Sequence, residues 1–256
     1  MPVLKGWHDH GPVGLGSSQA HRFVAENGNQ YLAKGPRYSP FHRRVAANEH
    51  IAAQLAAMLG VPVLDHCIIE FKGDFFFATN WMSPASFYAD VTGDLVRSCA
   101  NRDRIYDVVA LDVYLCNVDR HDNNLVVRRV EGVTYPPQHL LVANDFSHCL
   151  LPPGRVVSML QDLVQSAPGA YVRSQLLRSE IADRQLLARA VEQISALSDE
   201  DLFEVVMALP LAFLDAESRP AIVEFLQARR DALGAVFHRD DATFTNLAPA
   251  PAPGPG

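Results

Sequence analysis

Short apolar runs separated by turn residues dominate the first eighty residues of the chain. Asn27-Gly28, a strong β-hairpin signal, lies between the runs HRFVA and QYLAK. Residues 72–74 separate the runs CIIEF and FFFATNWM in the same way. We therefore predict two antiparallel hairpins in this region, with Lys34 at the end of a strand.

A helical spacing of apolar residues is present at 40–59 and again at 104–116. The first of these segments starts at Ser39-Pro40, a pair typical of a helix N-terminus, and ends at Gly60. Both segments are therefore predicted to be helices.

The runs LVVRRV and HLLVA, joined by residues 131–138, predict a third hairpin. After Asp145 the pattern is mainly helical, up to a last amphipathic helix with the sequence AIVEFLQARRDALGAVF. This order indicates an α+β protein with a small strand-rich lobe followed by a helical lobe that carries a polar hairpin.

Composition narrows the class of protein. The chain has 256 residues, 48% of them hydrophobic, and a net charge of -7 at pH 7. This charge argues against nonspecific nucleic-acid binding but allows a local nucleotide site. The four cysteines lack CxxC spacing, so we expect reduced thiols. Because neither a signal-peptide pattern nor a long apolar run is present, we expect a cytoplasmic protein without a membrane segment.

The stretch NVDRHDNNLVV, residues 117–127, contains more polar residues than a turn requires. In an antiparallel hairpin, the start of the first strand lies beside the end of the second. Asn124 precedes the first strand, Asp145 follows the second, and Asp119 lies in the loop that leads to this end. We therefore expect these three side chains to converge.

Two carboxylates and an amide oxygen suit Mg²⁺ with phosphate partners, and one carboxylate can instead orient or deprotonate a hydroxyl. Phosphoryl transfer needs this division of roles. Upstream, N–H groups of the glycine-rich stretch 11–19 can cover phosphates, and Lys34 can contact them. Glu49 on the next helix can pair with Lys34. Protein kinases combine these parts in this chain order.

Several of these patterns have other interpretations. Taken alone, Lys34 and Glu49 are ordinary exposed residues, and the glycine-rich stretch is a flexible turn. His121-Asp122 resembles the metal-ligand pair of a class of phosphohydrolases, but it lacks the helical context and the further ligands of those sites. The segment 7–12, WHDHGP, can chelate a transition metal, although a structural or exposed role is favoured without a third ligand.

Together, the motifs resemble the HipA-like kinases, atypical bacterial Ser/Thr kinases related in their core to phosphoinositide kinases. The matching segments are YLAKGP, RRVAANEHIAAQLAAMLGVPV, ALDVYLCNVDRHDNNLVV, HLLVANDFSHCLL and RPAIVEFLQARRDALGAVF. The resemblance extends to about Phe237. Its most specific part is NxDRHxxN followed by a hairpin and an aspartate.

The resemblance implies a role for each matching residue. Asp119 is the implied catalytic aspartate, which faces the acceptor hydroxyl. Lys34 is the implied ligand of the ATP phosphates, with Glu49 as its ion-pair partner. Asn124 and Asp145 are the implied Mg²⁺ ligands.

Further implied roles are supporting ones for Arg120 and His121. The sequence departs from ordinary kinases in having DFS instead of DFG, DRH instead of HRD, and no A-P-E motif. The remaining implied ATP-binding residues come from the glycine-rich loop and the adenine hinge: Gly14, Gly16, Ser17, Ser18, Asn80, Trp81 and Met82.

Regulation and partners follow from the same resemblance. Some HipA kinases are silenced by phosphorylation of a serine in the glycine-rich loop, so Ser17 and Ser18 are candidate autophosphorylation sites. The implied partners are ATP, a protein substrate and an antitoxin-like regulator, without direct nucleic-acid or membrane binding. The chain is shorter than full-length HipA toxins, which leaves a toxin role open.

The overall prediction is a two-lobed protein-kinase-like fold, with an N-lobe at 1–82, a helical C-lobe at 83–240 and a disordered Pro/Ala/Gly tail at 241–256. We expect an ATP- and Mg²⁺-dependent Ser/Thr kinase. One alternative is a lipid or small-molecule kinase, although a lipid kinase needs a larger basic patch than this chain suggests. Another is a nucleotide-binding pseudokinase.

Overall fold

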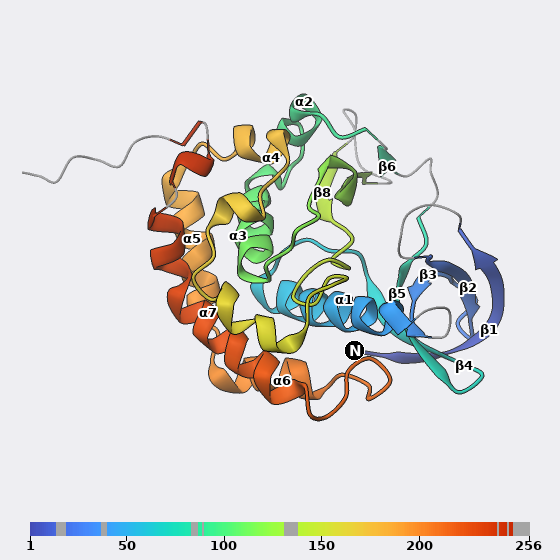
Figure 1. Ribbon diagram of the computed structural model, residues 1–256. Coiled ribbons are helices and arrows are strands. Elements are labelled where there is room, and N and C mark those ends of the chain that lie inside the picture. Colours follow the sequence, from blue (N-terminus) through green and yellow to red (C-terminus); the bar gives the residue numbers. More distant parts are fainter. Residues whose placement is uncertain are drawn as a thin grey trace, which may run out of the picture.

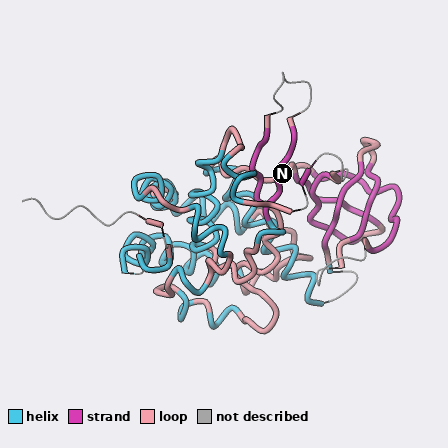
Figure 2. Tube along the Cα trace, turned by 90° about the horizontal axis from the view of Figure 1, so that it is seen from above, coloured by secondary structure: helices cyan, strands magenta, loops and turns pink. Residues whose placement is uncertain are grey.

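The computed structural model describes residues 1–13, 19–36, 40–82, 87–88, 90–130, 138–239, 241–244 and 246–247. A strand-built part and a mainly helical part lie side by side (Figure 1). Seen from above, the strands of the first part are separate from the helices of the second, with a further hairpin between them (Figure 2). The chain therefore combines helices and strands in the predicted order.

The strand-built part is a closed five-stranded barrel. Both predicted hairpins are present, and aromatic side chains fill the interior; the rings of Phe23 and Phe76 lie 5.0 Å apart. The barrel order is β1-β2-β3-β5-β4. Its strands are β1 (Val3–Pro12), β2 (His21–Ala25), β3 (Gln30–Lys34), β4 (His66–Phe71) and β5 (Asp74–Asn80).

The first strand, β1, was not predicted. It pairs antiparallel with β2 and parallel with β4, where Val3 lies opposite Ile68, and this second pairing closes the barrel. The segment WHDHGP lies in this strand. There the His8 and His10 rings contact each other, and Asp9 pairs with His21 at 3.0 Å. No group of three or more His, Cys, Asp or Glu residues in the described part of the chain could hold a metal ion.

Helix α1 (Pro40–Leu59) packs against β3 and β5 on one side and against helix α6 on the other. Gly60 directly follows the last helical residue, and its positive φ of +66° favours glycine. Buried alanines and Ile51 and Leu55 line its inner face. Because α1 joins the two parts of the molecule, its polar residues Glu49 and His50 are buried between them.

The third predicted hairpin is confirmed as β7 (Leu125–Arg129) and β8 (His139–Ala143), with β6 (Phe87–Tyr88) at the edge of β7. Leu125 lies opposite Ala143, and the Asn144 amide donates to the Asn124 carbonyl at 3.0 Å. The register therefore brings Asn124 and Asp145 to the same end of the hairpin.

The helical part is built around α3 (Ile105–Tyr114), nearly all of whose residues are buried. Tyr114 donates a hydrogen bond to the Leu226 carbonyl at 3.0 Å. None of the described helices combines the length and apolarity needed to span a membrane. The remaining helices are α2 (Gly93–Arg97), α4 (Gln175–Glu180), α5 (Arg184–Ser195), α6 (Asp199–Met207) and α7 (Arg219–Arg239).

The C-terminal boundary predicted at residue 240 falls too early. A 3₁₀ turn covers Asp241–Thr243, and Phe244 is buried with its ring stacked on Phe237 at 6.2 Å. An aromatic side chain can add to the core beyond the last periodic helix, so the packed chain continues to about residue 247. The Pro/Ala/Gly segment 248–256 lies outside the described residues, and the other domain boundaries stay predictions.

The buried imidazole of His50 should make stability depend on pH. Burial, with smaller effects from His66 and the terminal amino group, lowers the pKa of His50 from 6.5 to about 4. Neither ring nitrogen has a hydrogen-bond partner among the described residues. The unfolded chain therefore binds a proton in the window from about pH 6.5 to 4 that the folded chain does not, and stability falls as pH falls through this window.

We expect wild-type protein to lose about 2 kcal/mol more than His50→Leu on going from pH 7.5 to pH 5, because Leu removes the titrating group at similar volume. Urea unfolding at the two pH values measures this difference. The contributions of other titrating groups cancel between the two proteins. An identical pH dependence would contradict the assignment.

Candidate active site

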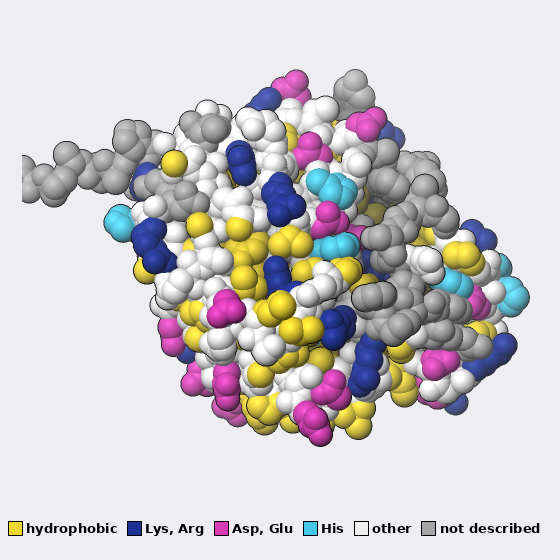
Figure 3. Space-filling view, in the orientation of Figure 1, with side chains coloured by type: hydrophobic (Ala, Val, Ile, Leu, Met, Phe, Trp, Pro, Cys, Tyr) yellow, Lys and Arg dark blue, Asp and Glu magenta, His cyan; other side chains and the backbone are white. Residues whose placement is uncertain are grey.

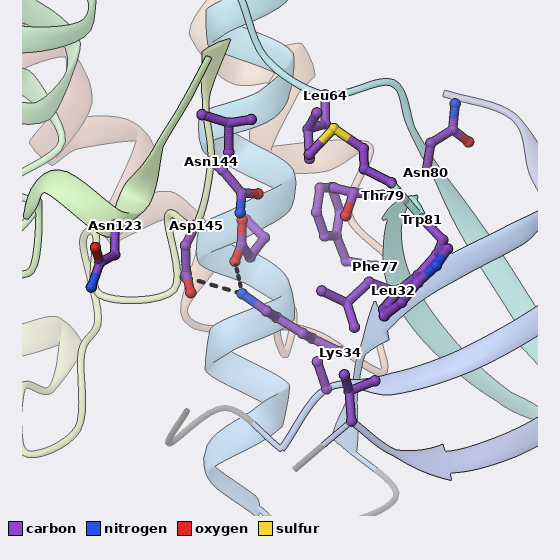
Figure 4. Close-up of a pocket in the computed structure, with 15 residues that line it drawn as sticks. Leu32, Lys34, Leu64, Phe77, Thr79, Asn80, Trp81, Asn123, Asn144 and Asp145 are labelled. Carbon is purple, nitrogen blue, oxygen red and sulfur yellow. Dashed lines mark hydrogen bonds and ion pairs between the residues drawn. The ribbon is translucent and has the colours of Figure 1, made fainter. Parts of the chain in front are cut away.

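Three charged side chains from different elements meet where the two parts of the molecule join. Lys34, at the end of β3, places its Nζ atom 2.5 Å from Glu49 Oε1 and 3.0 Å from Asp145 Oδ1 (Figure 4). Glu49 comes from α1, and Asp145 follows β8. The order of residues in the sequence predicted the Lys34–Glu49 pair, and the structure brings these two residues together.

The electrostatics keep Lys34 and Asp145 charged. Burial lowers the pKa of Lys34, but the carboxylates of Asp145 and Glu49 outweigh it and raise that pKa above its ordinary value. Burial raises the pKa of Asp145, but Lys34 and hydrogen bonds from Ser147 outweigh it and bring that pKa below its ordinary value. Ionised Asp145 therefore stabilises the fold at neutral pH, and this contribution is lost as pH falls below the ordinary aspartate pKa.

The backbone around Asp145 forms a fixed turn. Asp145 has a φ of +57°, a left-handed conformation that Asp tolerates better than most residues. Its Oδ1 atom accepts the Ser147 N–H at 3.1 Å, and the Phe146 N–H donates to Glu49 Oε2 at 3.1 Å. These bonds hold the DFS segment against α1 without a glycine at its third position.

Arg120 ties the polar loop to its surroundings. Its guanidinium is buried, bonds both Asp112 oxygens at 2.7 and 3.1 Å, and lies 4.6 Å from the centre of the Phe146 ring. It also donates to the carbonyls of Asn124 and Asn144. The side chain therefore fixes the loop, the hairpin and the turn after it relative to one another, a role that the sequence assigned only as supporting.

The backbone at Asp119 is set by neighbouring asparagines. The Asp119 N–H donates to Asn117 Oδ1 at 3.1 Å, and Asn124 Nδ2 donates to the Asp119 carbonyl at 2.8 Å. The carboxylate itself is 46% exposed and lies 3.4 Å from His148 Nδ1. A fixed backbone with a half-exposed carboxylate suits a group that contacts a substrate hydroxyl.

Sequence reasoning missed His148. Its position in the sequence, three residues after Asp145, does not indicate a contact with Asp119. That contact depends on how the segment after the hairpin folds back.

A cavity of about 350 Å³ lies beside the charged group. Apolar side chains from both parts of the molecule form its walls, including Leu32, Phe77 and Val126. Of the predicted hinge residues, Asn80 and Trp81 lie on the opposite side from Asp145 (Figure 4), and Met82 also lines the cavity. Volume and lining are those of a small-molecule site with an apolar slot and a charged end.

Other predicted residues take different places. His121 is exposed at the loop surface. Asn123 lines the cavity, whereas Asn124 is buried and is not among the residues that line it. The predicted phosphate-binding loop residues lie outside the described residues: Gly14, Gly16, Ser17 and Ser18. Their described neighbours Val13 and Ala20 do line the cavity.

The oxygen donors near the cavity fit a magnesium ion. Asn124 is held through its Nδ2 atom, and no described residue donates to its Oδ1 atom. Asp145 supplies an ionised carboxylate at the same end of the hairpin. One or two protein oxygens, with substrate phosphates completing the shell, is the usual Mg²⁺ arrangement.

Comparison with solved structures finds a similar fold in kinases. The Helicobacter pylori proinflammatory kinase CtkA matches with a TM-score of 0.58 and 14% identity, over 85% of this chain and 90% of that chain. A second match comes from the Shewanella oneidensis MR-1 toxin–antitoxin complex of HipA, HipB and operator DNA. It has a TM-score of 0.50 and 15% identity, over 93% of this chain and 68% of that chain.

The predicted relationship to HipA-like kinases is thus confirmed at the level of the fold. A Golgi casein kinase with Mn/ADP bound matches at a TM-score of only 0.45, with 12% identity over 94% of this chain and 74% of that one. No family model and no curated protein sequence matches the chain.

Proposed function

We propose that this protein is an ATP- and Mg²⁺-dependent kinase that transfers the γ-phosphoryl group to a Ser or Thr hydroxyl of a protein. The observation that carries the proposal is the contact of Lys34 with both Glu49 and Asp145 at the charged end of an apolar cavity. A structural ion pair would need only one partner. In protein kinases, a strand lysine that pairs with a helix glutamate lies beside an aspartate that holds Mg²⁺ at the nucleotide phosphates.

The nucleotide would bind with its base in the apolar slot and its phosphates towards Lys34. The slot between Leu32, Phe77 and Val126 excludes water from the base, and the 80–82 segment borders the slot. Lys34 then neutralises phosphate charge, while Glu49 keeps its side chain from turning away. Asn124 and Asp145 would hold Mg²⁺, which supplies further neutralisation of phosphate charge.

Asp119 would act on the acceptor. Its half-exposed carboxylate can accept a hydrogen bond from an incoming hydroxyl. It would take the proton of that hydroxyl as the new P–O bond forms and the bond from the γ-phosphorus to the bridging oxygen breaks, so that ADP leaves. Arg120 does not contact the substrate in this scheme. It fixes the position of the loop that carries Asp119 relative to the turn that carries Asp145. In this scheme, catalysis comes mainly from the positioning of the reacting groups.

The test is incubation of the purified protein with γ-labelled ATP and Mg²⁺, with a generic protein acceptor and with Asp145→Asn as control. We expect label on wild-type protein or acceptor and none above background in the variant. Mapping of the label tests self-phosphorylation at Ser17 or Ser18. Nucleotide binding without transfer to any acceptor would favour a pseudokinase, and transfer only to lipids or small molecules would overturn the choice of acceptor.

A further inference from the structure

A second cavity, of about 740 Å³, opens beside Asp119 and shares no lining residue with the first. Val118, immediately before Asp119, lines it. So does His148, which lies 3.4 Å from the Asp119 carboxylate. The backbone neighbour of Asp119 and the side chain that contacts its carboxylate thus both line the second cavity, so a group bound there lies close to Asp119.

The second cavity joins an apolar floor to positive charge. Met159 and Leu163 contribute apolar surface, and Met159 is 47% exposed. The segment between β8 and α4 crosses the front of the molecule (Figure 1). That face shows hydrophobic side chains together with Lys, Arg and His groups and with Asp and Glu groups (Figure 3). An apolar floor joined to positive charge suits a chain that carries both apolar and acidic groups.

Two arginines supply the positive charge. Arg155 is held in place, because its Nη1 atom donates to the Leu150 carbonyl at 2.9 Å. The Arg173 side chain is exposed, and no described residue pairs with its guanidinium. Asp162 is the single acidic residue among the described lining residues. The two arginines outnumber the one aspartate in the described lining of this cavity, in a chain whose net charge is -7.

We propose that this cavity binds the acceptor segment of a protein substrate in which Asp or Glu residues flank the Ser or Thr. The inference rests on the proposed kinase function and adds the chemical class of its substrate. A flanking carboxylate reaches Arg173, where a paired hydrogen bond to the guanidinium is available. The apolar floor receives the neighbouring side chain, and the hydroxyl lies at Asp119.

A peptide fits these features better than a membrane surface or a nucleic acid. Recognition of an anionic membrane takes a cluster of about four to eight basic residues. This cavity instead offers two separate cations beside an apolar floor, which matches side chains spaced along a polypeptide.

The test measures binding without catalysis. A fluorescent synthetic peptide with Glu residues around a central Ala, in place of the acceptor Ser, is compared by anisotropy with the same peptide carrying Gln. We expect wild-type protein to bind the Glu peptide about five- to ten-fold more tightly at low salt, with the difference reduced at high salt. Arg173→Glu should abolish this preference, because it replaces an attraction with a repulsion.

Arg189→Glu is the matched control. Arg189 is exposed on α5, and this substitution changes the net charge by the same amount as Arg173→Glu. We expect it to keep the preference for the Glu peptide. Equal affinity of wild-type protein for the two peptides, or an equal loss in both variants, would overturn the inference even if the protein phosphorylates other acceptors. Failure of the kinase proposal is seen separately, as absence of transfer from γ-labelled ATP.

Discussion

Replacing Asp119 with Asn should slow phosphoryl transfer by about 10²–10⁴-fold, the usual contribution of a group that accepts a proton in the transition state. Asn keeps the size of the side chain but cannot take the proton of the acceptor hydroxyl. Nucleotide affinity should be nearly unchanged, because Asp119 does not line the cavity that holds Lys34. Single-turnover transfer and equilibrium nucleotide binding measure the two effects separately.

Asp122→Asn is the matched control for this variant. Asp122 lies in the same loop, and its carboxylate accepts a hydrogen bond from Ser174 on the side of the helical part. The change of charge is the same, but the group does not contact Asp119 or Lys34. A similar fall in transfer rate for both variants would mean that the loop acts through its charge or its folding, and Asp119 would lose its assigned role.

The stability of Asp119→Asn should also be close to that of wild type. The carboxylate is 46% exposed, and its contact with His148 is 3.4 Å long, so little folding energy depends on it. A residue whose replacement has a large effect on the rate of phosphoryl transfer and a small effect on folding stability acts in the reaction and not in holding the fold. That combination separates Asp119 from the buried residues around it.

The parts of the site that the sequence could predict depend on local geometry. A hairpin places the residue before its first strand beside the residue after its second, so the pattern around Asn124 and Asp145 was enough to bring them together. Chain order was enough to suggest Lys34 with Glu49. The first prediction follows from the fixed geometry of a hairpin, and the second from the order of parts along the chain that protein kinases share.

Contacts between distant segments could not be predicted in this way. The pairing of Val3 with Ile68 closes the barrel, but alternation along a strand does not say which partner it meets. The contact of His148 with Asp119 and the cavity around Arg173 depend on how an irregular segment folds back over the helices. Apolar periodicity carries no information about such a segment.

Arg120, to which the sequence assigned only a supporting role, determines the geometry of the site through its buried hydrogen bonds. Replacing it with Met should lower the free energy of unfolding by about 3–5 kcal/mol, because Asp112 would keep a buried charge without its partner. Met is close in length, so the loss reflects charge and hydrogen bonds more than an empty volume. Urea unfolding should show a lower midpoint with an unchanged m-value.

Arg128→Met is the matched control for Arg120→Met. It removes the same charge from an exposed position on β7 and should change the free energy of unfolding by less than about 0.5 kcal/mol.

The double variant Asp112→Leu with Arg120→Met separates the effect of Arg120 on folding stability from its effect on the position of the catalytic loop. Removing both buried charges should recover much of the lost stability, since an apolar pair of similar volume can replace a buried ion pair. Phosphoryl transfer should stay low, because the Asn124 and Asn144 carbonyls then lose the guanidinium that holds both of them against the loop that carries Asp119. Recovery of both stability and transfer would show that Arg120 only maintains the fold.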